Sequence, residues 1–195
     1  AHADGVNVKE ANDFVAWGGS SSTSASTGSN IRLYAQDNWG EDLIFNVYDG
    51  APYYWDKTLG LGSRATSFAA QAGASDAPTV TRRIMVSGAD RHVVCFGCNA
   101  LGGSSQDLLM VRWSDQESPV DWTPTATNTA GSQRISSGSQ IISAQKTRQE
   151  MLIWTDTSIH AMRFTGPPFT FGISMLANNV SIIGPNAVTT VGDKV

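Results

Sequence analysis

Apolar and polar residues alternate over short runs along this chain, and no long run shows helical periodicity. From Asn30 onward, runs rich in aromatic and β-branched residues recur, bounded by glycine, asparagine and aspartate. Alternation over about four to eight residues is typical of β-strands, whereas helices need longer segments. The pattern therefore predicts a chain that is nearly all β.

The predicted strands repeat in three units of the same order. They are IRLY, NWGEDLIFNV and APYYWD in the first unit, RRIMVS, RHVVCFGC and DLLMVRWSD in the second, and SQIIS, RQEMLIWTD and SIHAMRF in the third. Weaker fourth strands follow as ATSF near Phe68, VDWT near Trp122 and FTFGIS near Phe171. Tyr34 and Leu43, Ile84 and Val93, and Ile142 and Met151 are each nine positions apart, which predicts equal offsets for the first two strands of each unit.

Four short antiparallel strands per unit, at spacings of 50 and 58 residues, predict a β-propeller-like array of four-stranded blades. A sandwich of irregular strands is the competing fold, and it leaves the equal offsets unexplained. Closed propellers have about four to eight blades, so three blades do not close. The chain starts at Ala1 and stops inside AVTTVGDKV, which resembles the start of another hairpin. We therefore expect an incomplete array that belongs to a longer polypeptide.

Two regions follow from this interpretation. Residues 1–30 are expected to hold an N-terminal strand and a flexible loop, because GGSSSTSASTGSN at 18–30 cannot bury a core. The alternative for this loop is a contact segment that a partner orders. Residues 31–195 are expected to form one domain of about three blades plus the start of another.

Charge and hydropathy argue against tight, sequence-specific DNA binding and against a membrane-spanning helix. The 195 residues include 13 basic and 17 acidic ones, a formal net charge of -4, with no basic run that would follow a phosphate backbone. No apolar run approaches the ~20 residues of a membrane-spanning helix, so we expect no membrane insertion by this segment.

Cys95 and Cys98 form a single C-x-x-C pair, with His92 three positions upstream. A closed zinc site needs four ligands, and the other histidines, His2 and His160, lack ligand spacing. The alternation around Cys95 instead predicts a small apolar residue that faces a core. Metal binding or redox chemistry is the alternative.

The segment RWSDQESPVDWTPT at 112–125 combines two tryptophans with three carboxylates, Asp115, Glu117 and Asp121. It could be an acidic active site, a sugar platform or a turn between strands. Glycosidases need two carboxylates that converge on one bond, and all three here come from one connection. We therefore predict a tight turn between the third and fourth strands of the second unit, since aspartate, serine and proline favour turns.

Two other segments suggest chemistry less strongly. Ser158 and His160 in WTDTSIH are two apart on one strand, which predicts a separation of about 7 Å and no nucleophile–base hydrogen bond. The acidic segment DNWGED at 37–42 lacks the spacing of a calcium loop and predicts a polar turn. We expect no catalytic, cofactor-binding or metal-binding residues in this chain.

Several longer motifs carry a resemblance. They are WGEDLI at 39–44, YYWD at 53–56, DRHVV at 90–94, RWSDQESPVDWTPTATNTAG at 112–131, TRQEMLIWTDTSIHAMRF at 147–164, GPPFTFG at 166–172 and NVSIIGPNA at 179–187. From about Ile31 onward the chain resembles structural tail proteins of tailed bacteriophages, of the tail-tube or nozzle type found in short-tailed phages. The loop at 18–30 lies outside the resemblance. No catalytic residue set is carried over from that family.

The resemblance implies a subunit that bears a β-propeller and assembles as a ring, commonly a hexamer, around the DNA exit channel. The expected partners are other copies of the chain, other tail proteins and genomic DNA that passes non-specifically. The expected location is the virion tail, after synthesis in the host cytoplasm. Polar loops at 18–30 and 99–106 are expected to contact neighbouring subunits.

The alternative function is a carbohydrate-binding or carbohydrate-cleaving β-propeller. Burial distinguishes the two, because tryptophans buried between blades cannot stack on a sugar. The residues to examine are Trp113, Trp122 and Trp154.

Overall fold

The structure is a computed structural model that describes residues 33–88, 90–166 and 168–190. Residues 1–32 lie outside the described part of the chain. The N-terminal strand and flexible loop expected within residues 1–30 therefore lie outside the described residues.

The described chain is all β apart from two short 3-10 turns, Lys57–Leu59 and Phe68–Ala70. It contains three four-stranded antiparallel sheets, and in each sheet neighbouring strands follow one another along the chain. The first sheet comprises β1 (Tyr34–Trp39), β2 (Asp42–Val47), β3 (Pro52–Trp55) and β4 (Thr66–Ser67). The second comprises β5 (Arg83–Val86), β6 (Val93–Phe96), β7 (Met110–Trp113) and β8 (Gly131–Arg134). The third comprises β9 (Ile141–Lys146), β10 (Met151–Thr155), β11 (Ser158–Gly166) and β12 (Thr170–Asn178). The predicted three units of four strands are confirmed.

The predicted fourth strand of the second unit is wrong. The edge strand is β8, and the VDWT segment around Trp122 lies in the long connection 114–130 that precedes it. The backbone of this segment bonds elsewhere: Trp122 N donates to Ser75 O at 3.1 Å, and Ser75 N donates to Val120 O at 3.1 Å. The tight turn predicted here is therefore wrong. The segment is a long loop, and its backbone bonds to Ser75 in the loop that leads into the second sheet.

The predicted equal offset of the first two strands is also wrong. The pairs that close the first hairpins are Trp39 with Asp42, Val86 with Val93 and Lys146 with Met151. The turns between them, residues 40–41, 87–92 and 147–150, differ in length. Gly40 has φ 65°, a left-handed conformation that suits the shortest of these turns.

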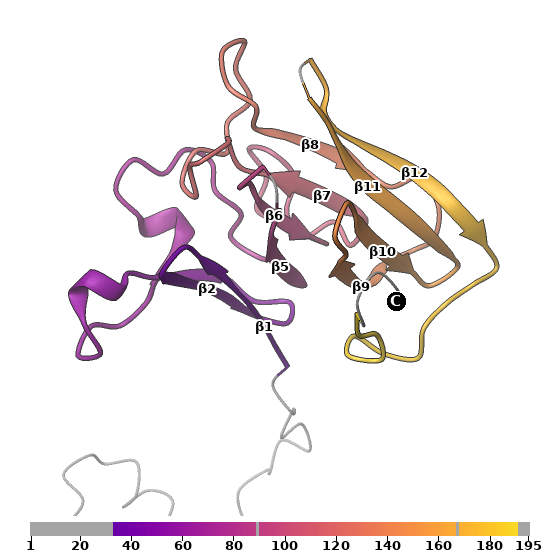
Figure 1. Cartoon of the computed structure of the whole chain (residues 1–195), viewed down its shortest axis with the longest axis horizontal. Helices are drawn as coiled ribbons and strands as arrows, with labels where there is room; N and C mark the ends of the chain where they lie inside the picture. The colour runs from indigo at the N-terminus through magenta and orange to yellow at the C-terminus, as the bar shows by residue number, and fades with distance from the viewer. Residues whose placement is uncertain (1–32, 89, 167, 191–195) are drawn as a thin grey trace, which may run out of the picture. The chain divides into compact units, whose positions relative to one another are not determined.

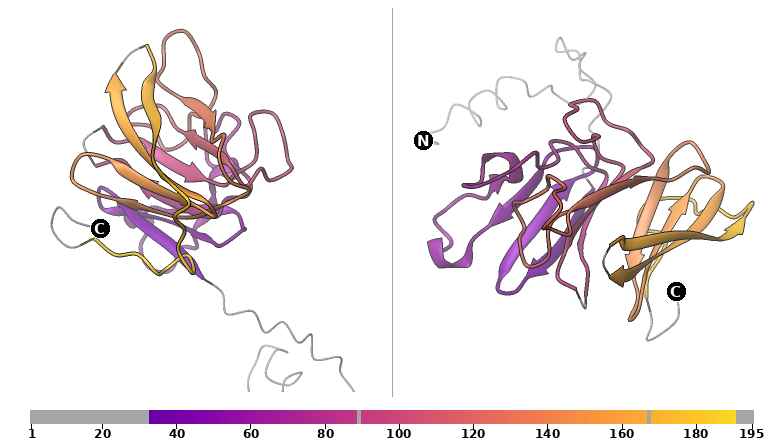
Figure 2. Two further views of the ribbon diagram at one scale, coloured as in Figure 1. Left: turned by 90° about the vertical axis from the view of Figure 1, so that its right-hand side faces the viewer. Right: turned by 90° about the horizontal axis from the view of Figure 1, so that it is seen from above.

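The second sheet lies between the other two, as the right-hand view of Figure 2 shows and as Figure 1 shows by the order of colours along the molecule. One face of the second sheet packs on the third sheet, with Phe96 and Val111 against Ile153 and Met162. Its other face packs on the first sheet, where Ile84 and Cys95 meet residues such as Ile44 and Phe68. Strands β5, β6 and β7 are buried on both faces for this reason, and they read as nearly continuous apolar runs.

The first strands of the three sheets are neighbours. β5 contacts both β1 and β9. The segment after β12 returns to the same side of the molecule, where Ser143 Oγ on β9 donates to Pro185 O at 2.6 Å and Gln145 Nε2 donates to Thr190 Oγ1 at 2.9 Å. Among the described residues, the structure contains no helix long and apolar enough to cross a membrane.

Candidate functional site

The tryptophan-rich segment is folded inward. Trp113 and Trp122 are 5% and 1% exposed, and Trp154 in the third sheet is 5% exposed. Each indole N–H of the first two is satisfied locally, because Trp113 Nε1 donates to Thr129 O and Trp122 Nε1 donates to Pro119 O, both at 2.9 Å. Their rings pack against phenylalanines, and because all three indoles are buried none offers a platform for a sugar ring.

The three carboxylates of this segment are held apart by separate partners. Asp115 Oδ1 accepts hydrogen bonds from the N and Oγ1 of Thr129 at 2.8 and 2.7 Å. Burial opposes ionisation of Asp115, but the bonds from Thr129 outweigh it and lower the pKa of this carboxyl. Asp121 accepts from Ser75 Oγ at 2.5 Å, whereas Glu117 pairs with Arg91 at 3.2 Å. Each carboxylate is therefore bound by its own partner.

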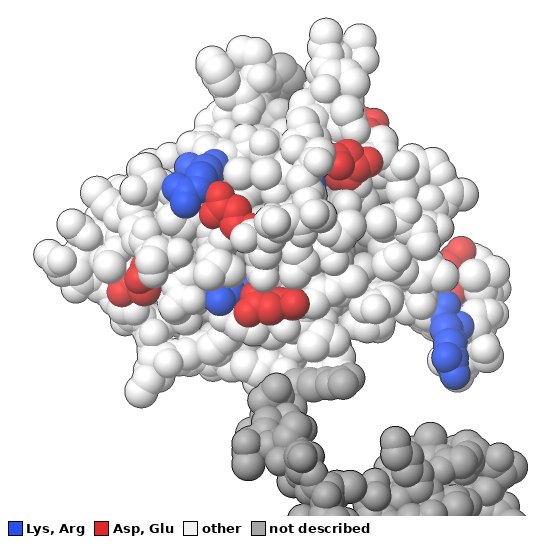
Figure 3. Space-filling model, turned by 180° about the vertical axis from the view of Figure 1, so that it is seen from behind, with Lys and Arg blue, Asp and Glu red and all other residues white. Residues whose placement is uncertain are grey.

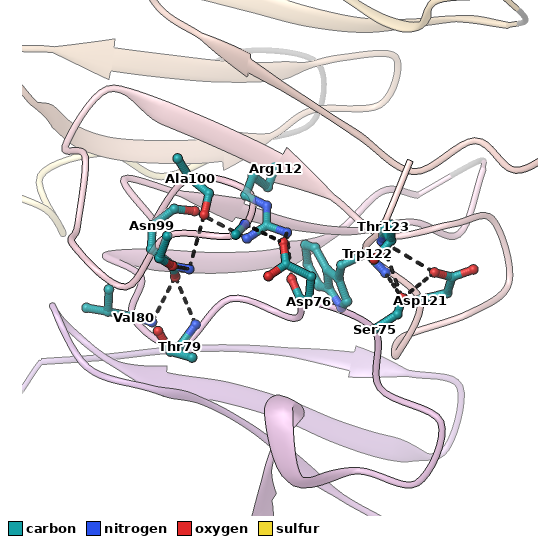
Figure 4. Close-up of polar contacts among 12 residues, drawn as sticks. Ser75, Asp76, Thr79, Val80, Asn99, Ala100, Arg112, Asp121, Trp122 and Thr123 are labelled. Carbon is teal, nitrogen blue, oxygen red and sulfur yellow. Dashed lines mark hydrogen bonds and ion pairs between the residues drawn. The ribbon is translucent and has the colours of Figure 1, made fainter. Parts of the chain in front are cut away.

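A second polar cluster lies beside this segment, and Figure 4 shows it. Arg112 on β7 is 1% exposed, and its guanidinium donates to Asp76 Oδ2 at 2.9 Å, Asp76 O at 2.6 Å and Asn99 O at 3.3 Å. The side-chain oxygen of Asn99 accepts from the backbone N of Thr79 and Val80 at 2.9 and 3.3 Å. Together these bonds fix residues 75–80, the link between the first two sheets, onto the second sheet.

The first strands are joined by two further polar ties. Asp37 on β1 accepts from Val86 N on β5 at 2.9 Å and from Lys146 Nζ on β9 at 2.6 Å. Arg82, just before β5, binds Asp49 from the first sheet at 2.9 Å and Gln140, just before β9, at 2.8 Å. Charged side chains therefore hold all three sheets together at one side. The prediction that 37–42 is a polar turn is only partly right, since Asp37 lies within β1.

The prediction that Ser158 and His160 lie too far apart to form a hydrogen bond is wrong. Ser158 Oγ lies 2.9 Å from His160 Nε2, within hydrogen-bonding distance. The predicted separation of about 7 Å applies to backbone positions, whereas the imidazole is long enough to lean along the strand. A register shift between Ile159 and His160 also distorts β11 at this point.

This pair is part of a buried hydroxyl network. Ser158 is fully buried, and its Oγ also lies 2.8 Å from Thr155 Oγ1 and 3.2 Å from Ser137 Oγ. Burial lowers the pKa of His160, which lines a hollow of about 210 Å³ between β8 and β12. The nearby carboxylate of Asp156 binds Ser139 N at 2.8 Å and Ser139 Oγ at 2.6 Å, so it does not orient the imidazole. These contacts join the β10–β11 hairpin to the loop that follows β8.

Cys95 and Cys98 are free thiols buried in the second sheet. Burial raises the pKa of both, that of Cys98 to about 12. Neutral thiols of this kind are poor nucleophiles and poor metal ligands. His92 turns away from them, with Nε2 3.0 Å from Thr129 Oγ1 and its ring against Phe171. Within the described residues, no three His, Cys, Asp or Glu side chains come together as a metal site.

Most charged side chains of the described residues form ion pairs. Figure 3 shows several basic patches directly beside acidic ones on an otherwise uncharged face. The pairs are Lys57–Glu41, Arg82–Asp49, Arg91–Glu117, Arg112–Asp76, Arg134–Asp107, Lys146–Asp37 and Arg163–Glu150. Each carboxylate in these pairs is bound by a different basic side chain of the same chain.

Sequence reasoning missed the side chains that hold the sheets together. Arg112 carried a usable signal, because it lies between apolar neighbours in a strand that is buried on both faces. A charge at such a position needs a buried partner. Asp76, its partner, lies in a loop and carried no such signal. No known family model matches this chain, and no curated protein matches it significantly.

Proposed function

We propose that this chain is a structural subunit of a virion, a tail tube or nozzle component of a short-tailed bacteriophage that forms a ring around the DNA exit channel. The observation that carries the proposal is the use of its polar side chains. Asp37, Arg82 and Arg112, each of which could serve chemistry, instead tie sheets and their linking segments together. These contacts suit a structural role better than a catalytic one.

We further propose that the three sheets are consecutive blades of a β-propeller-like array. Two features support this. The sheets pack face to face in chain order, and their first strands β1, β5 and β9 lie side by side, as the innermost strands of a propeller do. The long motifs that resemble phage tail proteins, such as the stretch 112–131, support the assignment to a tail.

The charge distribution suits a conduit. The chain has a formal charge of -4, and many of its basic groups pair with carboxylates of the same chain. A wall with few free cations binds phosphates weakly, and passing DNA then releases few counterions. DNA can therefore slide through without being held.

The alternative, a carbohydrate-binding or carbohydrate-cleaving propeller, has less support. It needs exposed tryptophans and facing carboxylates, whereas Trp113, Trp122 and Trp154 are buried and Asp115, with its two bonds from Thr129, is occupied.

Two measurements on the same purified protein test the proposal. Light scattering over a concentration series measures the mass of the assembly, and incubation with bacterial polysaccharides measures the release of reducing ends. We expect assemblies larger than one chain and no sugar release. Sugar release by the wild type that is lost in Asp115→Asn, with unchanged circular dichroism, would replace the structural role with the carbohydrate role.

A further inference from the structure

Arg83, the first residue of β5, has no carboxylate partner among the described residues. Its guanidinium donates to neutral oxygens instead. Nη1 lies 3.2 Å from both Ser143 Oγ and Pro185 O, and Nη2 lies 3.4 Å from Gln145 Oε1. These separations are long, because an N–H···O hydrogen bond usually spans about 2.9–3.0 Å. The third nitrogen, Nε, is buried and has no hydrogen-bond partner in the described part of the chain.

Two other buried arginines of the second sheet and its leading segment are paired with carboxylates. Arg82 binds Asp49 at 2.9 Å, and Arg112 binds Asp76 at 2.9 Å. Taking a guanidinium out of water without a counter-charge is costly, which is why buried charges are normally paired. Burial accordingly lowers the pKa of Arg83. The described residues thus leave the negative charge that Arg83 requires to another group.

A cavity of about 10 Å³ adjoins Arg83. Residues from the first strands of all three sheets line it, Ala35 on β1, Arg83 on β5 and Ile142 on β9, together with Pro185 and Asn186 from the segment after β12. Tyr34 and Asn186, which also line it, are exposed, so a small ion can reach the cavity from solvent.

The polar side chains around this cavity favour an anion. Each of them carries at least one N–H or O–H donor, and they are the guanidinium groups of Arg82 and Arg83, the hydroxyls of Tyr34 and Tyr48 and the amide of Asn186. No acidic residue is among those that line the cavity. Asp49 compensates Arg82, which leaves the positive charge of Arg83 uncompensated.

The size of the cavity limits what it can hold. A cavity needs roughly 10–15 Å³ for one water molecule, so this one has room for a single particle of about that size. Phosphate, sulfate and organic acids are too large. A water molecule would accept a hydrogen bond from Nε but would not neutralise the guanidinium.

We infer that this cavity binds one monatomic anion of the halide class, such as chloride, as the counter-ion of Arg83. Because the lining residues come from three sheets and from the segment after β12, the bound anion joins these parts and stabilises the folded chain. The inference does not depend on the proposed function, since Arg83 needs a counter-ion whatever the chain assembles with.

Thermal unfolding of the whole chain in sodium chloride and in sodium gluconate, at equal ionic strength, tests the inference because gluconate is too large for the cavity. The variants are Arg83→Met and the matched control Arg134→Met, which removes an exposed arginine bound to Asp107. We expect the Tm of the wild type and of Arg134→Met to rise in chloride relative to gluconate by about 2 °C or more beyond any change in Arg83→Met. Bromide should act like chloride. An equal chloride response in all three proteins would overturn the inference.

A second variant supplies the negative charge from the chain itself. Asn186→Asp places a carboxylate of nearly the same size at the wall of the cavity, so it should reduce the chloride response to that of Arg83→Met and be at least as stable as the wild type in gluconate. If Arg83→Met does not fold, broadening of the chlorine NMR signal decides. The wild type should broaden this signal and Asn186→Asp should not. No broadening by the wild type, or equal broadening by both proteins, would overturn the anion site.

Discussion

Replacing Asp76 with asparagine tests whether the buried charge of Arg112 depends on this one carboxylate. The guanidinium is 1% exposed, and Asp76 Oδ2 lies 2.9 Å from it. A hydrogen bond to a charged group contributes roughly 1.5–3 kcal/mol, and removing one partner of a fully buried pair costs about 3–5 kcal/mol. Arg112 keeps two carbonyl acceptors, Asp76 O and Asn99 O, and the Asp76 side chain is 32% exposed. We therefore expect a loss of about 2–3 kcal/mol in the free energy of unfolding.

Urea unfolding followed by tryptophan fluorescence measures this loss, because Trp113 adjoins Arg112 on β7. The matched control is Glu41→Gln, which breaks an exposed pair with Lys57 whose side chains are 78% and 52% exposed. Exposed pairs contribute little, so this control should lose less than about 0.5 kcal/mol. Equal losses in the two variants would refute the reasoning, since they would mean that Arg112 is compensated by other groups.

Three further predictions concern packing and protonation. Gly131→Ala should lower the free energy of unfolding, measured in urea, by about 1–3 kcal/mol, because its Cβ would lie 2.6 Å from Trp113 Cζ2. The control Gly62→Ala should leave it unchanged, because a Cβ there meets no described atom within 4 Å. Burial lowers the pKa of His92 and of His160, so the stability they contribute is present above about pH 6.5 and is lost as the pH falls through their folded pKa values. The variant His160→Gln should therefore flatten the fall of Tm between pH 7.5 and pH 5. An unchanged slope would contradict this prediction. Replacing Cys95 and Cys98 together with alanine should cost no more than a few kcal/mol of packing energy and leave the metal content of the purified protein unchanged, as elemental analysis can measure.

Alternation predicted the sheets well because burial acts directly on side chains. In β5 to β7 and in β9 to β11 the apolar runs in the sequence coincide with strands, since each run must cover one or two sheet faces. The VDWT segment shows where this reasoning fails. Trp122 is buried, as an aromatic strand residue would be, but it packs on Phe68 across a sheet interface. Burial alone does not reveal which backbone a segment pairs with.

Side-chain contacts were harder to predict than strands. The 2.9 Å approach of Ser158 to His160 depends on side-chain rotamers and on a local register shift, and neither is written in the spacing of two residues. The tie between Arg82 and Gln140 joins residues 58 positions apart, and it exists only because the second and third sheets stack. Sequence patterns predict which faces are buried, whereas the partners of polar groups follow from how the sheets are stacked.

Electron microscopy of the purified protein tests the central claim, that this chain is a ring-forming structural subunit, most directly. We expect closed rings of identical copies around an open centre. Isolated single chains at concentrations where ring proteins assemble, or paired chains with no central opening, would contradict it.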